Sequence, residues 1–366
     1  MKMITMFIIL FVVLIVGHIY VGTHIWRILP IPTWAKIIVI SLMGIAFLML
    51  FVGISPLQNH FPMPVATTVY ETGTSWIIIL LYLAILFLIL DLGRLCTIVP
   101  AQFLKSSWIG TISVTAIITG IFIYGNIHYN EKIREEMSIA TEKPIGHQKK
   151  ILLVSDMHIG YHNNRAELAR WIDLLNAEHA DAILVAGDII DGAIRPVSEE
   201  RMWEELRRLN APVYACLGNH EYITGLREST EFYKKAGITL LRDSVANLDN
   251  ISIIGRDDRS NEARKPTAEL IRNIDNKQFT ILLDHQPYNL EESEQAGIDL
   301  QFSGHTHHGQ VWPLNWVTDA LYEKAFGTHQ RGNTRYYVSS GLGIWGGKFR
   351  IGTRSEYVVL TITKVE

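Results

Sequence analysis

Five short clusters of histidine, aspartate and asparagine follow apolar runs after residue 150, and these residue types could do chemistry. In chain order the clusters are Asp156-Met157-His158, Gly187-Asp188, Gly218-Asn219-His220-Glu221, Asp284-His285 and Gly304-His305-Thr306-His307. Imidazole nitrogens together with carboxylate and amide oxygens suit borderline divalent ions such as Mn, Fe, Co or Zn, whereas calcium takes oxygen ligands only. The residue types are therefore consistent with a site for two divalent metal ions.

The spacing within the clusters supports metal binding. In the D-x-H and H-x-H clusters the two side chains are two residues apart, so in an extended segment both leave the same face and can bind one ion. A glycine precedes Asp188, Asn219 and His305 and lets the backbone turn sharply there. Each cluster alone has a plainer explanation, since a lone D-x-H is usually structural, Gly-Asp often marks a turn and Asn219 could cap a helix. The ordered set of five favours function.

The apolar runs before these clusters are rich in β-branched residues and alternate with amphipathic segments, a pattern typical of an α/β domain. Eight strands are expected, at 151–155, 182–187, 212–218, 251–255, 279–284, 299–304, 335–341 and 356–362. Helical spacing of apolar residues predicts helices over 165–180 and 199–209. Because ligand sites in α/β sheets gather at the carboxyl ends of strands, the five clusters could converge on one crevice.

The first third of the chain is nearly free of charge. Residues 1–128 contain five basic and two acidic side chains. Four stretches are apolar over about the 20 residues that a membrane helix needs, near 3–21, 37–55, 75–95 and 108–126. They lack the charged face of a buried core helix. We therefore expect a multi-pass membrane module over 1–127, a polar linker over 128–149 and a second domain over 150–366.

Charge also bears on sidedness and on partners. The loops after the first and third apolar stretches each carry two basic residues, and the loop between the second and third carries none, which favours an extracytoplasmic second domain. Lys2, before the first stretch, and Lys132 and Arg134, just past the fourth, favour the opposite side. A net charge of −3 without a basic stripe gives no reason to expect a nucleic-acid partner. With only Cys96 and Cys216, a cysteine-based zinc site and a disulfide framework are excluded.

As an ordered set, the five clusters resemble the signature of the calcineurin-like metallophosphoesterases over residues 150–310, and SDMHIG and GHTHHGQVWP resemble its bacterial membrane-associated branch. The resemblance implies a two-sheet β-sandwich flanked by helices. It implies one metal bound by Asp156, His158 and His307, and a second bound by Asn219, His285 and His305. Asp188 would bridge the two ions. The family usually has a small residue at the position of His308, which is expected to be an outer neighbour.

The resemblance implies hydrolysis of phosphate mono- or diesters or of pyrophosphates. Two metal ions about 3.5–4 Å apart lower the pKa of a shared water, which then supplies hydroxide to attack phosphorus. His220, the one histidine of these blocks that the family does not assign to a metal, is expected to act as general acid or transition-state stabiliser. Glu221 either orients the His220 ring or is a solvated loop charge.

Membrane anchoring favours a lipid-linked substrate, such as a phospholipid or a polyprenyl phosphate. Two alternatives stay open. One is a nucleotide or cyclic-nucleotide phosphodiesterase whose membrane part serves only location. The other is a transporter or membrane sensor whose second domain merely binds a metal, although few charged residues lie within the apolar stretches and no ion pathway is visible.

Overall fold

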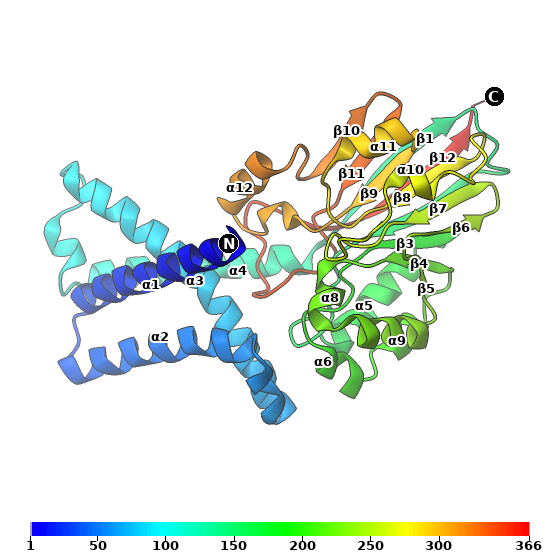
Figure 1. Ribbon diagram of the computed structural model, residues 1–366. Coiled ribbons are helices and arrows are strands. Elements are labelled where there is room, and N and C mark those ends of the chain that lie inside the picture. Colours follow the sequence, from blue (N-terminus) through cyan, green and yellow to red (C-terminus); the bar gives the residue numbers. More distant parts are fainter. Residues whose placement is uncertain (1, 366) are drawn as a thin grey trace. The chain divides into compact units, whose positions relative to one another are not determined.

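A computed structural model describes residues 2–365 and divides the chain into two compact units (Figure 1). The first, here called the helical unit, comprises Met1–Asn126 and Gly346–Lys348. The second, the sheet unit, comprises Ile127–Trp345 and Phe349–Glu366. Each unit has its own hydrophobic core.

The helical unit is built on four long helices, which are α1 (Lys2–Ile28), α2 (Thr33–Gly53), α3 (Met63–Leu95) and α4 (Trp108–Asn130). Two short 3₁₀ helices, η1 (Pro56–His60) and η2 (Ala101–Leu104), lie in the connections. All four long helices contain a stretch that is long and apolar enough to cross a membrane. The expectation of four apolar N-terminal helices is therefore confirmed.

The core of the helical unit takes side chains from every long helix, including Val21, Met43, Leu83 and Val114. Helices α2 and α3 approach each other closely at Gly73. A Cβ there would stand 2.3 Å from the backbone nitrogen of Leu50, so no larger residue fits without separating the helices. Small residues allow the same close approach between helices in membranes.

The sheet unit contains two six-stranded sheets. The order in the first is β1 (Lys132–Thr141), β12 (Ser355–Lys364), β2 (Lys149–Val154), β3 (Ala182–Ala186), β4 (Val213–Cys216) and β5 (Thr239–Leu240). The order in the second is β10 (Gly327–Arg331), β11 (Thr334–Val338), β9 (Leu300–Ser303), β8 (Phe279–Leu283), β7 (Ile251–Gly255) and β6 (Ser244–Leu248). Strands β2 to β5 run parallel, as do β7, β8, β9 and β11. All eight expected strands are present.

Successive side chains of a strand point to opposite faces of the sheet, and this alternation explains how the sheets and helices are layered. In β2, Ile151 and Leu153 belong to a cluster shared with Ile281 and Phe302 of the second sheet, so these side chains fill the space between the sheets. The intervening Leu152 and Val154 pack instead with the helices on the outer face of the first sheet. This arrangement confirms the expected two-sheet sandwich with helices outside.

The helices of the sheet unit are mostly short. They are α5 (Arg165–Asn176), α6 (Ile194–Glu199), α7 (Trp203–Leu206), α8 (Asn219–Thr224), α9 (Leu226–Ala236), α10 (Thr267–Leu270), α11 (Leu290–Ala296) and α12 (Leu314–Leu321). The helix expected over 199–209 is reduced to α7. The chain leaves helical geometry at Arg201, whose φ of 52° is left-handed.

The segment expected as a linker, 128–149, contains the ten-residue strand β1, which pairs in parallel with β12 along its whole length. Along β1, Ile133, Met137 and Ile139 point towards the core and alternate with more exposed residues. Charged neighbours hide this period in the sequence. The Glu135 carboxylate, for example, accepts a hydrogen bond of 2.8 Å from Arg354 in the adjoining segment. Residues 132–141 are thus part of the folded sheet unit.

Candidate metal centre

The five clusters follow five strands at their carboxyl ends, as the sequence predicts. Three follow β2, β3 and β4 of the first sheet, and two follow β8 and β9 of the second. Neighbouring parallel strands end at the same edge of a sheet, which brings the clusters of each sheet together. Contacts between clusters from different sheets, described below, show that all five meet at one place.

Five of the expected ligands have a left-handed backbone, with φ between 46° and 69°. They are Asp156, His158, Asp188, His305 and His307. This conformation is uncommon for residues other than glycine, and it concentrates at functional sites because surrounding contacts must enforce it. The preceding glycines are needed for space as well. A Cβ on Gly304 would stand 2.1 Å from Oδ2 of Asp156.

The first group consists of Asp156, His158 and His307, whose ligand atoms lie within 4.8 Å of one another. The Nε2 atoms of the two histidines face each other at 3.0 Å. Oδ1 of Asp156 is 3.7 Å from Nε2 of His158 and 3.5 Å from Nε2 of His307. Two ring nitrogens aimed at one point beside a carboxylate form a donor set that fits a divalent cation.

The second group consists of Asp188, His285 and His305, again within 4.8 Å. Nδ1 of His285 lies 2.7 Å from the carbonyl oxygen of Ala186, which orients Nε2 towards Asp188 at 3.1 Å. The amide oxygen of Asn219 is buried and has no hydrogen-bond partner among residues 2–365. A buried acceptor without a partner is costly, by about 1–3 kcal/mol, and a bound cation would satisfy it.

Asp188 contacts both groups. Its Oδ2 atom lies 3.1 Å from Nε2 of His285 and 3.7 Å from Nε2 of His158. Its Oδ1 atom accepts a hydrogen bond of 2.8 Å from the backbone of His220, which fixes the carboxylate. One oxygen therefore faces a ring nitrogen from each group.

The sequence reasoning missed Asp191, three residues after Asp188. This buried carboxylate has Oδ1 3.2 Å from Nδ1 of His220 and 3.4 Å from Nδ1 of His158. The signal was available, because Asp191 ends the short string GDIID that begins at Gly187. His220 thus has a carboxylate neighbour on one side of its ring.

Glu221 does not orient the His220 ring, and it is not a solvated charge. It is fully buried, and its carboxylate accepts hydrogen bonds from the backbone nitrogens of Asp188, Ile190 and Gly218 at 2.8–3.1 Å. These bonds hold the loops after β3 and β4 together. The expectation failed because the direction of a side chain at a strand end depends on neighbouring loops that are distant in sequence.

His308 lies outside both groups. Its ring stacks on Phe326, with centroids 4.7 Å apart, and its Nε2 atom is 3.6 Å from Oδ2 of Asp319 in α12. Its position next to His307 is that of an outer neighbour. It also joins the loop after β9 to α12.

A second residue that the sequence reasoning missed is Arg350, which is fully buried. Its guanidinium donates to the carbonyl oxygens of His307, at 2.7 Å, of Gly343, at 3.1 Å, and of Ser340. Burial lowers its pKa to about 10, and it remains charged at neutral pH. Arg350 lies 43 residues after His307, and no local pattern links the two.

Burial and neighbouring carboxylates act in opposite directions on the histidines. Burial lowers the pKa of His158, but the neighbouring carboxylates of Asp156 and Asp191 outweigh it and raise the pKa to about 10. At His307 burial dominates and lowers the pKa to about 3, and at His305 burial, reinforced by His285, lowers the pKa to about 4. The rings of His305 and His307 are therefore neutral at pH 7, as metal ligands must be.

Comparison with known proteins agrees with this geometry. Residues 149–309 match the family described as calcineurin-like phosphoesterase. An uncharacterized metallophosphoesterase of Aquifex aeolicus is 32% identical over 241 residues, which cover 62% of this chain and 90% of that protein. One from Campylobacter jejuni is 29% identical over 259 residues, 68% of this chain and 69% of that protein.

One further relative and one solved structure are similar to parts of this chain. A transmembrane protein with metallophosphoesterase domain from Danio rerio is 29% identical over 226 residues, covering 57% of this chain and 51% of that protein. Among solved structures, a 5'-nucleotidase precursor from Thermus thermophilus aligns over 53% of this chain and 50% of its own, with a TM-score of 0.37 and 16% identity. On the family match and the Aquifex relative, this chain belongs to the calcineurin-like phosphoesterase family and is a metal-dependent phosphoesterase.

Proposed function

We propose that the sheet unit binds two divalent metal ions and hydrolyses a phosphoester bond beside them. Asp156, His158 and His307 would hold one ion, and Asn219, His285 and His305 the other. The observation that carries this proposal is the position of Asp188, because one of its oxygens faces ring nitrogens of both groups. A carboxylate so placed can serve two ions at once.

When bound, two divalent ions would supply a water of lowered pKa and offset charge on the phosphoryl oxygens. His220 donates a proton to the leaving oxygen, a contribution worth about 10²–10⁴ in rate. With Asp191 beside Nδ1, the ring is held so that Nε2 is the nitrogen left for the substrate. Arg350 holds the backbone of His307 and so keeps that ring in place.

For the substrate, we propose a phosphoester at a lipid surface. Helix α12 follows directly after the loop of His307 and carries exposed apolar side chains, among them Trp316 at 62% and Leu321 at 69% exposure. Tyr322, the residue after α12, has its ring 6.3 Å from that of His305. An apolar helix with exposed tryptophan is typical of contact with the membrane interface, and here it adjoins the metal centre.

Activity assays of manganese-loaded full-length protein in lipid nanodiscs test the substrate class. Hydrolysis of a bilayer phospholipid is compared with that of a soluble chromogenic phosphodiester and of a cyclic nucleotide. We expect Trp316→Ser to slow only the lipid reaction, and Val245→Ser, an exposed apolar position on β6, to change neither. Equal effects of Trp316→Ser on all three substrates, or activity on the cyclic nucleotide alone, would reject the lipid substrate and leave the phosphoesterase assignment intact.

We further propose that the sheet unit lies outside the cytoplasm. Two of the three basic residues that argue against this, Lys132 and Arg134, take part in the sheet unit. Lys132 lies over the ring of Tyr129 at 3.7 Å, and Arg134 pairs with Glu178 at 2.7 Å. Labelling of a Thr230→Cys variant in intact cells with a membrane-impermeant maleimide, in a Cys96→Ser background, tests the side, since Cys216 is buried. Labelling only after cell lysis would place the unit inside.

A further inference from the structure

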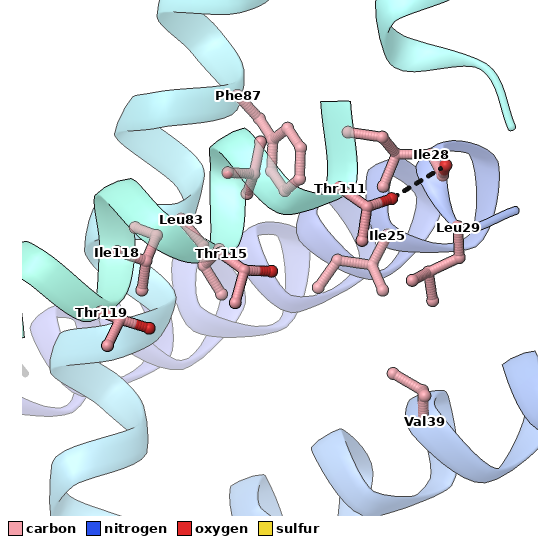
Figure 2. A pocket seen from close by; sticks show the side chains of 11 residues that line it. Ile25, Ile28, Leu29, Val39, Leu83, Phe87, Thr111, Thr115, Ile118 and Thr119 are labelled. Atoms are coloured by element: carbon pink, nitrogen blue, oxygen red, sulfur yellow. Dashed lines mark hydrogen bonds between the residues drawn. The ribbon is translucent and has the colours of Figure 1, made fainter. Parts of the chain in front are cut away.

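The helical unit contains an apolar pocket of about 240 Å³ to which all four long helices contribute (Figure 2). The lining residues are Ile25, Ile28, Leu29, Val39, Leu83, Phe87, Thr111, Val114, Thr115, Ile118 and Thr119. The polar atoms among these side chains are the hydroxyls of three threonines spaced along α4. The Thr111 hydroxyl is already used, because it donates to the carbonyl oxygen of Ile28 at 3.2 Å.

The pocket has a buried floor and an open side. Ile28, Leu83, Phe87 and Val114 are buried, whereas Thr115 on α4 is exposed. An enclosed apolar cavity of about 150 Å³ already binds a molecule the size of benzene. Because the helices are long and apolar enough to cross a membrane, hydrocarbon is the medium expected at this open side. The pocket therefore fits a lipid chain.

The pocket lies towards the end of the helical unit where the basic side chains gather. Arg27 is in the last turn of α1, Lys36 near the start of α2, and Lys105 shortly before α4. Contacts join these three segments. Nζ of Lys36 donates to the backbone of Trp26 at 2.9 Å, and the nitrogen of Ser106, next to Lys105, donates to the carbonyl oxygen of Arg27 at 2.8 Å.

The carboxylate of Asp91 on α3 does not pair with these charges. Oδ2 of Asp91 accepts a hydrogen bond of 2.9 Å from the Tyr20 hydroxyl and lies 2.9 Å from Nε2 of His24. Within residues 2–365, no carboxylate lies within ion-pair distance of Arg27 or Lys105. The rim is therefore basic, while the pocket below it is apolar.

We propose that this pocket is a binding site for an anionic phospholipid of the surrounding bilayer. One acyl chain occupies the pocket, and the phosphate lies at the basic rim. Basic pockets between membrane helices bind anionic headgroups in this way. The proposal rests on the four helices crossing a bilayer. It uses none of the metal-centre residues and holds whatever ester that centre cleaves.

Native mass spectrometry of the full-length protein, released from nanodiscs containing equal phosphatidylglycerol and phosphatidylcholine, tests the site. We expect one retained lipid, mostly phosphatidylglycerol. Thr115→Trp fills the pocket and should abolish retention, whereas Ile117→Trp, two residues along α4 at an exposed position, should not. A second pair on α2 repeats the comparison in case the first pair does not fold. Val39→Trp fills the pocket, and Ile37→Trp, at an exposed position, is its control.

The binding of the lipid headgroup is tested by two variants, Arg27→Gln and Lys105→Gln, singly and combined. Each removed charge should lower the preference for phosphatidylglycerol about fivefold, the equivalent of about 1 kcal/mol per basic residue. No retained lipid in the parent, equal retention of both lipids, or equal loss in Thr115→Trp and Ile117→Trp would overturn the proposal. A lipid-free dimer that Thr115→Trp converts to a monomer would assign the pocket to a second copy of the chain and also overturn it.

Discussion

The Asp191 carboxylate lies beside the imidazole of His220, with Oδ1 3.2 Å from Nδ1. The same oxygen is 3.4 Å from Nδ1 of His158. Burial opposes ionisation of Asp191, but its interactions with the two neighbouring histidines outweigh this and lower its pKa. One buried, ionised carboxylate thus orients a ring proposed to bind metal and a ring proposed to donate a proton.

Asp191→Asn should lower kcat about 10–100-fold, because a carboxylate that orients a histidine in a metal centre typically contributes that much. The substitution preserves shape and removes the charge, so metal content should stay close to that of the parent. Steady-state kinetics with metal analysis checks this. Asp173→Asn, at an exposed carboxylate paired with Arg208, is the matched control and should have no effect. An unchanged kcat in Asp191→Asn would show that Asp191 does not orient His220 for catalysis.

His220→Ala should retain both metals and lose about 10²–10⁴ in kcat. The loss should depend on the leaving group, since a general acid matters most when the leaving oxygen is basic. We therefore expect a large loss for an alkyl phosphodiester and a smaller one for a nitrophenyl phosphodiester, measured side by side. An equal loss for both esters would show that His220 acts in another way, such as by stabilising charge on phosphorus.

Deleting β1 should destabilise the sheet unit. A fragment starting at residue 142 lacks the strand that pairs with β12 and loses the burial of Ile139, which alone is worth about 2 kcal/mol. It also exposes the edge of β12, which favours aggregation. Chemical denaturation and size-exclusion chromatography of fragments starting at 127 and at 142 make the comparison. Equal midpoints and equal monodispersity would mean that β1 is dispensable.

The sequence predicted those parts of the fold that local patterns encode. Apolar β-branched runs such as 151–155 mark buried strands because both faces of a parallel strand are covered, and the polar residue after each run marks its end. Strand β1 was missed because charged residues occupy its exposed face and one partly buried position, where Glu135 is paired. Its ordering depends on β12, more than 200 residues away in sequence, which no local pattern reveals.

For the candidate site, too, the sequence predicted some features and missed others. The expected ligand residues Asp156, His158 and His307 come together because β2 of the first sheet and β9 of the second end close to each other in the sandwich. Side-chain directions were not predictable, and Glu221 turns to backbone amides while Asp191 takes the place beside His220. Arg350 reaches the backbone of His307 only through the tertiary fold.

The central claim, that Asp188 serves two metal ions at once, is tested most directly by metal stoichiometry and electron paramagnetic resonance of manganese-loaded protein. We predict two ions per chain with a spin-coupled signal in the parent and in Asp191→Asn. In Asp188→Asn we predict one ion or none, no coupling, and loss of phosphodiester hydrolysis. A single ion in the parent, or two coupled ions and full activity in Asp188→Asn, would contradict the account.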